Sequence, residues 1–253
     1  MRPIYKEVAT LHRIHDTPTS KEIKKVVKLA KEHGLGSMIQ ITVELNQPGF
    51  VSSNNIGNEF APYQYRRWFE KYIRYVKRYA KVAQKCGAEI LSIGHNLNHL
   101  SKWEKFWVEI IEAARKEFKG KITYSASIQE EFKGIGFWED LDFIGVSGDI
   151  DYDIHKDTTE EHIQDHISEF NKKIDYLAKT WKKPALVTLM VAQPSFETSG
   201  KTTVSRIHHD AQANYLKGFL SGIKENKNLK GVFVGNWVPH PGFGGHDDAS
   251  TSP

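Results

Sequence analysis

Short apolar runs rich in β-branched residues recur along the chain and predict buried strands. Each run is nearly continuous in apolar character, which is typical of strands of a parallel sheet that are covered on both faces. Most of the runs begin about 30 to 50 residues apart, a spacing that suits strand-helix units. The seven predicted strands are Glu7–Leu11, Met38–Val43, Glu89–Ile93, Ile122–Ala126, Leu141–Val146, Ala185–Val191 and Gly231–Val234.

Segments with helical periodicity lie between these runs. The first begins at a Thr19 or Ser20 cap and closes on Gly34, and the second places its aromatic residues on one stripe and its Arg and Lys residues on the other. The predicted helices are Ser20–His33, Pro62–Lys85, Trp103–Phe118, Thr159–Trp181 and His208–Glu225.

Repeated strand-helix alternation predicts a parallel α/β sheet, and in this length of chain a (β/α)8 TIM barrel. Seven predicted strands are one short of a closed barrel. Either the first βα unit is absent or an eighth strand escapes the pattern. No Gly/Ser-rich linker interrupts the chain, so we expect residues 1–253 to form a single (β/α)-barrel domain.

Composition narrows the function classes. The chain has 253 residues and a formal net charge of +4, with charges of both signs interspersed, which argues against a nucleic-acid groove. One cysteine, Cys86, excludes an intrachain disulfide, and the start MRPIYKEVAT has no apolar signal region. No apolar run approaches about 18 residues, so we expect no membrane span. We expect a monomer, with the cytoplasm as the default compartment.

Two long, turn-rich stretches each follow a predicted strand. They are Asn46–Phe60 and Val191–Ser205. In a barrel both would lie at the carboxyl-terminal face of the strands, where the sites of such enzymes are built.

Six segments resemble the clan-A glycoside hydrolase barrels, most closely the β-mannanases of glycoside hydrolase family 113. Their order and spacing agree with that family over roughly Thr17 to Pro253. The resemblance implies a (β/α)8 barrel with a sugar cleft at the carboxyl ends of the strands. The segments are Pro18–Leu35, Tyr75–Leu97, Lys119–Tyr124, Phe137–Val146, Lys183–Thr188 and Gly231–Trp237.

The same resemblance implies that both catalytic glutamates are replaced. Such enzymes are retaining glycosidases, in which two carboxylates about 5 Å apart act as acid/base and nucleophile. The acid/base Glu of a motif like IGTEL corresponds to Asn96, in Ile93-Gly94-His95-Asn96-Leu97. The nucleophile Glu of a motif like PVLFTEVGY corresponds to Leu189. An amide donates no acidic proton and an aliphatic side chain attacks no anomeric carbon.

Other expected cleft positions also differ from the family pattern. This combination of a retained scaffold and altered strand ends suggests a pocket refitted by evolution or by engineering. Thr42 stands where the family has a His, Ser127-Ile128 where it has Asn-Trp, Ser147-Gly148-Asp149 where it has Asp-Ala-Tyr, and Val234-Gly235 where it has a Trp pair.

Two carboxylates are candidate general bases. Asp149 follows a strand, and an apolar pocket formed by Gly148, Leu189, Gly235 and their neighbours would raise its pKa. A solvated loop aspartate is the simpler interpretation. Glu44 ends another strand and could bind substrate or act as base, or it could form a structural ion pair at the barrel mouth.

Glu130 and Glu131 are predicted to begin a helix after the strand Ile122–Ala126. Their negative charges at its N-terminus would stabilise the helix dipole.

Neutral polar side chains that follow the predicted strand Glu89–Ile93 suit the hydroxyl groups of a sugar. His95, Asn96 and Asn98 offer imidazole and amide groups, and Trp237 could stack on a sugar ring or simply pack at the rim. We expect no metal and no other cofactor, because the histidines form no known zinc motif. The full set of predicted ligand-binding residues is His95, Asn96, Asn98, Thr42, Ser127, Leu189, Gly235 and Trp237.

Three functions fit these observations. The first is a refitted glycosidase-type barrel that binds a small organic or sugar-like ligand and transfers a proton with Asp149 or Glu44 as base. The second is a carbohydrate-binding pseudoenzyme without activity. The third is a working β-mannanase-like hydrolase that uses other carboxylates.

Overall fold

The structure is a computed structural model, and it describes most of the predicted helices and strands. It describes residues 17–43, 55–58, 60–129, 131–147, 159–190 and 209–234. The predicted strand Glu7–Leu11 lies outside these residues. By its internal contacts the chain divides into two compact units, Met1–Gly145 and Val146–Pro253, which are described separately below.

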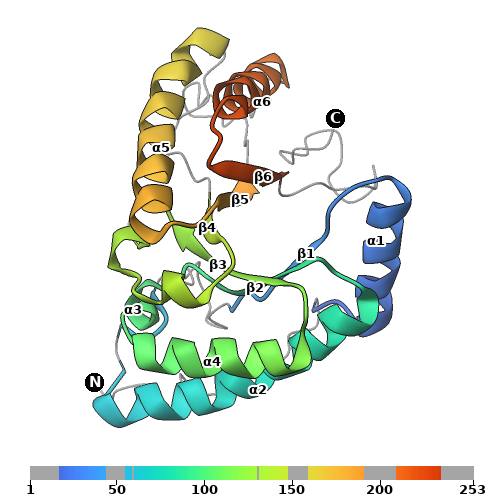
Figure 1. Ribbon diagram of the computed structural model, residues 1–253, viewed down its shortest axis with the longest axis vertical. Coiled ribbons are helices and arrows are strands. Elements are labelled where there is room, and N and C mark those ends of the chain that lie inside the picture. Colours follow the sequence, from blue (N-terminus) through green and yellow to red (C-terminus); the bar gives the residue numbers. More distant parts are fainter. Residues whose placement is uncertain are drawn as a thin grey trace, which may run out of the picture. The chain divides into compact units, whose positions relative to one another are not determined.

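The first unit alternates helices and parallel strands (Figure 1). β1 pairs with β2 and β2 with β3, both in parallel, so the strands follow their chain order. Its elements are α1 (Ser20–Glu32), β1 (Met38–Gln40), α2 (Pro62–Cys86), β2 (Ile90–His95), α3 (Asn98–Ser101), α4 (Glu104–Glu117), β3 (Lys121–Ser127) and the 3₁₀ helices Phe132–Gly134 and Phe137–Asp140.

The second unit repeats the same alternation. β4 (Ile144–Ser147) begins at the end of the first unit and runs into the second. It is followed by α5 (Glu160–Trp181), β5 (Ala185–Met190), α6 (His209–Lys224) and β6 (Leu229–Val234), and β5 pairs with β6 in parallel. Helices α5 and α6 pack against each other: the Gly222 backbone lies so close to Ile167 that a Cβ there would meet Ile167 Cγ2 at 2.5 Å.

Local signals explain where the helices of the first unit begin and end. Thr19 caps α1 in a reciprocal pair with Glu22, whose backbone N–H lies 3.3 Å from Thr19 Oγ1. Pro62 starts α2, and Gly87 ends it in the left-handed conformation at φ +74°. The predicted helix bounds are therefore confirmed to within a few residues.

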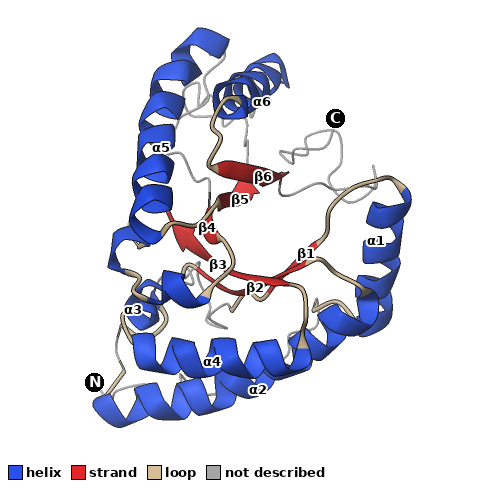
Figure 2. Ribbon diagram, viewed as in Figure 1, coloured by secondary structure: helices blue, strands red, loops and turns tan. Residues whose placement is uncertain are grey.

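Helices α2 and α4 lie on the same side of strands β2 and β3 (Figure 2). Aromatic side chains form a core between these elements. Trp68 stacks on Tyr72 with ring centroids 4.6 Å apart, and Trp107 of α4 meets Tyr124 of β3 edge-on at 5.0 Å. All four side chains are buried. The aromatic stripe predicted on α2 is thus confirmed as core, with Tyr65 half-buried at its edge.

Two predicted strands are wrong at one end. The run Met38–Val43 forms a strand only as far as Gln40, after which the Ile41 N–H still donates to the carbonyl of Ser92 at 3.0 Å. The run Leu141–Val146 becomes a strand only at Ile144. Asp142 interrupts it because its carboxylate accepts the N–H of Ile122 at 2.9 Å.

Candidate functional site

Polar side chains gather at the carboxyl ends of β2 and β3. On β3 the small polar residues Thr123, Ser125 and Ser127 alternate with Tyr124, whose ring packs against Trp107 of α4. Successive side chains of a strand point to opposite faces of a sheet. The serines therefore occupy the face opposite the aromatic core, and this face at the strand ends is where barrel enzymes bind substrate.

His95 is the last residue of β2, and its partner is Ser125 on β3. The distance between His95 Nδ1 and Ser125 Oγ is 3.0 Å. Burial lowers the pKa of His95 from 6.5 to about 4. The imidazole is therefore neutral at pH 7 and can exchange neutral hydrogen bonds with a ligand, but it carries no positive charge.

Asn96 follows directly, in the left-handed conformation at φ +46°. Its backbone N–H donates to the carbonyl of Ser125 at 2.9 Å, and the residue is 7% exposed. Asparagine adopts this conformation more readily than other residues with a Cβ. Asn96 therefore suits the backbone of this turn, whatever its side chain binds.

A buried tyrosine-glutamate pair fixes the next residue of the turn. The Leu97 N–H donates to Tyr124 Oη at 2.8 Å, and Tyr124 Oη donates to Glu131 Oε1 at 2.6 Å. Burial, and next the negative charge of Glu131, raise the pKa of Tyr124 well above its usual value. The tyrosine thus stays protonated and keeps its hydrogen bond to the carboxylate.

Glu131 begins a helix, as predicted, but the helix is short and the side chain is buried. Glu131 is 4% exposed. The helix that follows it, Phe132–Gly134, is a single 3₁₀ turn with little dipole to stabilise. Its partner Tyr124 lies seven residues back along the chain, so the helix-cap pattern of the sequence concealed this pairing. Glu130 lies outside the described residues.

The remaining predicted residues are spread over several elements. Ser127 Oγ accepts the Gln129 N–H at 3.3 Å, and Asn98 opens α3. Thr42 is exposed beyond the end of β1. Leu189 is half-buried on β5 of the second unit. His95 and Asn96 are the pair that the structure brings together, on Ser125. Four predicted residues lie outside the described part of the chain: Glu44, Asp149, Gly235 and Trp237.

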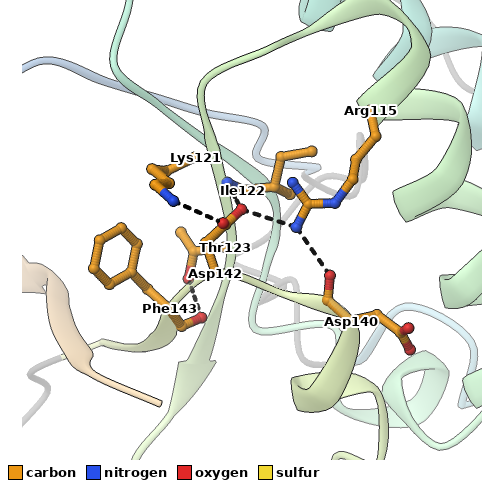
Figure 3. A network of polar contacts seen from close by, with 7 residues as sticks. All are labelled: Arg115, Lys121, Ile122, Thr123, Asp140, Asp142 and Phe143. Atoms are coloured by element: carbon orange, nitrogen blue, oxygen red, sulfur yellow. Dashed lines mark hydrogen bonds and ion pairs between the residues drawn. The ribbon is translucent and has the colours of Figure 1, made fainter.

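The opposite ends of the strands carry a charged cluster (Figure 3). The carboxylate of Asp142 accepts hydrogen bonds from Arg115 Nη2 at 2.8 Å, Lys121 Nζ at 3.2 Å and the Ile122 N–H at 2.9 Å. Burial alone would raise the pKa of Asp142, but these three donors outweigh it and hold the pKa below its usual value. The cluster joins α4 to β3 and to the segment that leads into β4.

Within the described residues, no group of three His, Cys, Asp or Glu side chains is placed to hold a metal ion. In the same part of the chain, no helix combines the length and the hydropathy that crossing a bilayer requires.

Solved structures with the same fold include β-mannanases. The β-mannanase AaManA from Alicyclobacillus acidocaldarius, in complex with ManMIm, matches with a TM-score of 0.73 at 20% identity over 96% of this chain and 76% of its own. Another GH113 β-1,4-mannanase complex matches with a TM-score of 0.71 at 22% identity over 92% of this chain and 74% of its own. The predicted (β/α)8-barrel fold of glycoside-hydrolase type is thereby confirmed.

The sequence itself defines the family. The sequence model of Glycoside Hydrolase Family 113 matches residues 6–243, and the chain therefore belongs to this family. A search of curated proteins finds no match.

Proposed function

We propose that this protein binds a saccharide at the carboxyl ends of β2 and β3 and does not hydrolyse it, because residues 96 and 189 provide no carboxylate pair for double displacement. The observation that carries this proposal is the neutral site formed by His95 and Asn96 on Ser125. Imidazole, amide and hydroxyl groups exchange neutral hydrogen bonds, which match the hydroxyls of a sugar.

The chemistry of a retaining glycosidase supports the second half of the proposal. Its two carboxylates lie about 5 to 5.5 Å apart across the scissile bond. By resemblance these positions correspond to Asn96 and Leu189, which have no carboxylate. Glu131 is a poor replacement because its carboxylate is hydrogen-bonded to Tyr124, whose ring packs against Trp107 on the face away from the serines.

The ligand class follows from the relatives. Two of the matching structures are GH113 β-1,4-mannanases, so we assign a β-1,4-linked mannose oligomer as the ligand of this chain. Its binding groups would be His95, Asn96 and Ser127, with the other predicted ligand-binding residues around them.

Calorimetric titration with mannotetraose, together with an assay for new reducing ends, tests the proposal. We expect binding without hydrolysis. Asn96→Gly keeps a residue that tolerates φ +46° but removes the amide, so affinity should fall at least fivefold with little loss of stability. Lys182→Gly is the matched control, because Lys182 is also left-handed at φ +53° but lies in the second unit. Its affinity should be unchanged.

Two results would overturn the proposal. The first is that wild-type protein does not bind mannotetraose. The second is that it hydrolyses mannotetraose, and loss of this activity in Glu44→Gln or Asp149→Asn would assign the cleavage to those carboxylates.

A further inference from the structure

A basic groove runs between α1 and α2 in the first unit, away from the carboxyl ends of β2 and β3. It encloses about 840 Å³ and is lined by seven cationic side chains and by no carboxylate. Lys21 and Lys24 come from α1. The other five come from α2: Arg74, Lys77, Arg78, Lys81 and Lys85.

The acidic residues of the two helices are engaged elsewhere. Glu22 bonds the Thr19 cap, Glu32 lies 3.5 Å from Lys28, and Glu70 lies 3.1 Å from Arg66. These three carboxylates therefore leave the charge of the groove uncompensated.

Among the seven cations, Lys81 alone has an ion-pair partner in the described part of the chain, Glu117 at 3.5 Å. Six positive charges thus face one groove in a protein whose whole net charge is +4. Such a concentration of one sign attracts an oppositely charged ligand and raises its rate of association.

The spacing of these charges indicates a linear ligand. Along α2 the cations fall at Arg74, the adjacent pair Lys77 and Arg78, Lys81 and Lys85. The steps from one of these positions to the next, outside the adjacent pair, are three or four residues, which is about 4.5 to 6 Å along a helix axis. Most are lysines, whose flexible point charges suit single anionic groups better than the planar fork of arginine would.

We propose that this groove binds a linear acidic polysaccharide with one carboxylate per sugar residue, a repeat close to one helical turn. Single-stranded nucleic acids bind on aromatic stacking platforms, and no aromatic side chain lines the groove. A membrane surface would require projecting apolar side chains, whereas the groove is concave and Val82 is its only aliphatic lining residue. The proposal is independent of the saccharide site at the strand ends.

Binding of a fluorescent oligogalacturonate by the full chain tests the proposal. With about five carboxylate contacts, affinity should fall roughly a hundredfold between about 50 and 200 mM salt. The variant Lys77→Glu, Arg78→Glu, Lys85→Glu should bind at least tenfold more weakly. The milder Lys77→Gln, Arg78→Gln, Lys85→Gln variant should lie between it and wild type. Both sets change exposed side chains, so the unfolding transition should be retained.

The matched control is Lys102→Glu, Lys105→Glu, Lys116→Glu, which makes the same change in net charge at exposed positions outside the groove. Its affinity should change less than twofold, and neutral mannan should not compete. Equal weakening by the control, salt-independent binding, or tighter binding of a DNA strand of equal charge would each overturn the proposal. So would no oligogalacturonate binding at low salt.

Discussion

The two ends of the strands in the first unit are stabilised by different means. At the amino ends, Asp142 binds Arg115 and Lys121, whose side chains are 41% and 61% exposed. At the carboxyl ends, the carboxylate of Glu131 is buried and accepts a hydrogen bond from the hydroxyl of Tyr124. One end pairs charged groups that water reaches, and the other buries a carboxyl group that is hydrogen-bonded to a tyrosine of the aromatic core.

This difference has a physical cost and a functional meaning. An exposed ion pair contributes at most about 1 kcal/mol, because water screens it. A buried carboxylate is more expensive to keep, and loss of its partner is correspondingly more damaging. In (β/α)8 barrels the amino ends serve stability and the carboxyl ends serve the site. The costly pair therefore holds the turn that presents Asn96.

Replacing Tyr124 by Phe should have the largest effect on stability. The change removes a donor from Glu131 and an acceptor from the Leu97 N–H, both in the interior, and we expect a loss of about 2 to 4 kcal/mol in urea unfolding. Tyr63→Phe, at a residue that is 69% exposed, should change stability by less than about 0.5 kcal/mol. Equal effects of the two changes would remove the energetic contrast between the strand ends.

Lowering the pH from 7 to 4 should reduce the free energy of unfolding through His95, at the carboxyl end of β2. The pKa of His95 is about 4 in the folded chain and about 6.5 when unfolded, so the unfolded state binds the proton preferentially. The contribution of His95 is complete above pH 6.5 and falls by roughly 2 to 3 kcal/mol as the pH approaches 4. Urea unfolding of wild type and His95→Gln at several pH values should show the difference. Parallel curves for the two proteins would contradict the lowered pKa.

A methyl group at Gly94 should also disturb the carboxyl ends. A Cβ there would lie 2.8 Å from Tyr124 Cε2 and 3.1 Å from Trp107 Cη2, so Gly94→Ala should destabilise by about 2 kcal/mol through overpacking. Gly134→Ala is the matched control, because its Cβ would meet no atom within 4 Å. Thermal unfolding midpoints of both variants equal to that of wild type would contradict the close packing of Gly94 against Tyr124 and Trp107.

The smallest effect is expected at the amino ends. Asp142→Asn should lose about 1 kcal/mol at pH 7, because its partners are largely exposed. The pKa of Asp142 is lowered by folding, so its contribution is present above its usual value of about 3.9 and is lost as the pH falls further. The two proteins should therefore unfold at the same urea concentration in strong acid. A gap that persists there would have another origin than charge.

Much of the fold could be predicted because its signals are local. The Thr19 cap, Pro62 and Gly87 each act within a few residues, and the aromatic stripe of α2 repeats with the helical period. The site depends on contacts between distant residues. The pairs His95 with Ser125 and Leu97 with Tyr124 are separated by 30 and 27 residues, and no local pattern reports them.

The burial of Glu131 likewise depends on a residue outside the local pattern. Two adjacent glutamates before a short apolar segment are typical of a helix start, and this local pattern does not report the buried hydrogen bond of Glu131 with Tyr124. Tyr124 was the available signal, since a tyrosine inside an otherwise apolar strand needs a partner for its hydroxyl.

In the turn after β2, contacts of the main chain fix the position of residue 96, so this position does not depend on the identity of its side chain. Neighbouring atoms grip the main chain there, the carbonyl of Ser125 at residue 96 and the hydroxyl of Tyr124 at residue 97. Different functional groups could therefore be installed at residue 96 by protein engineering without rebuilding the loop, provided that each tolerates a left-handed backbone. Glycine and aspartate would fit such a series with the least strain.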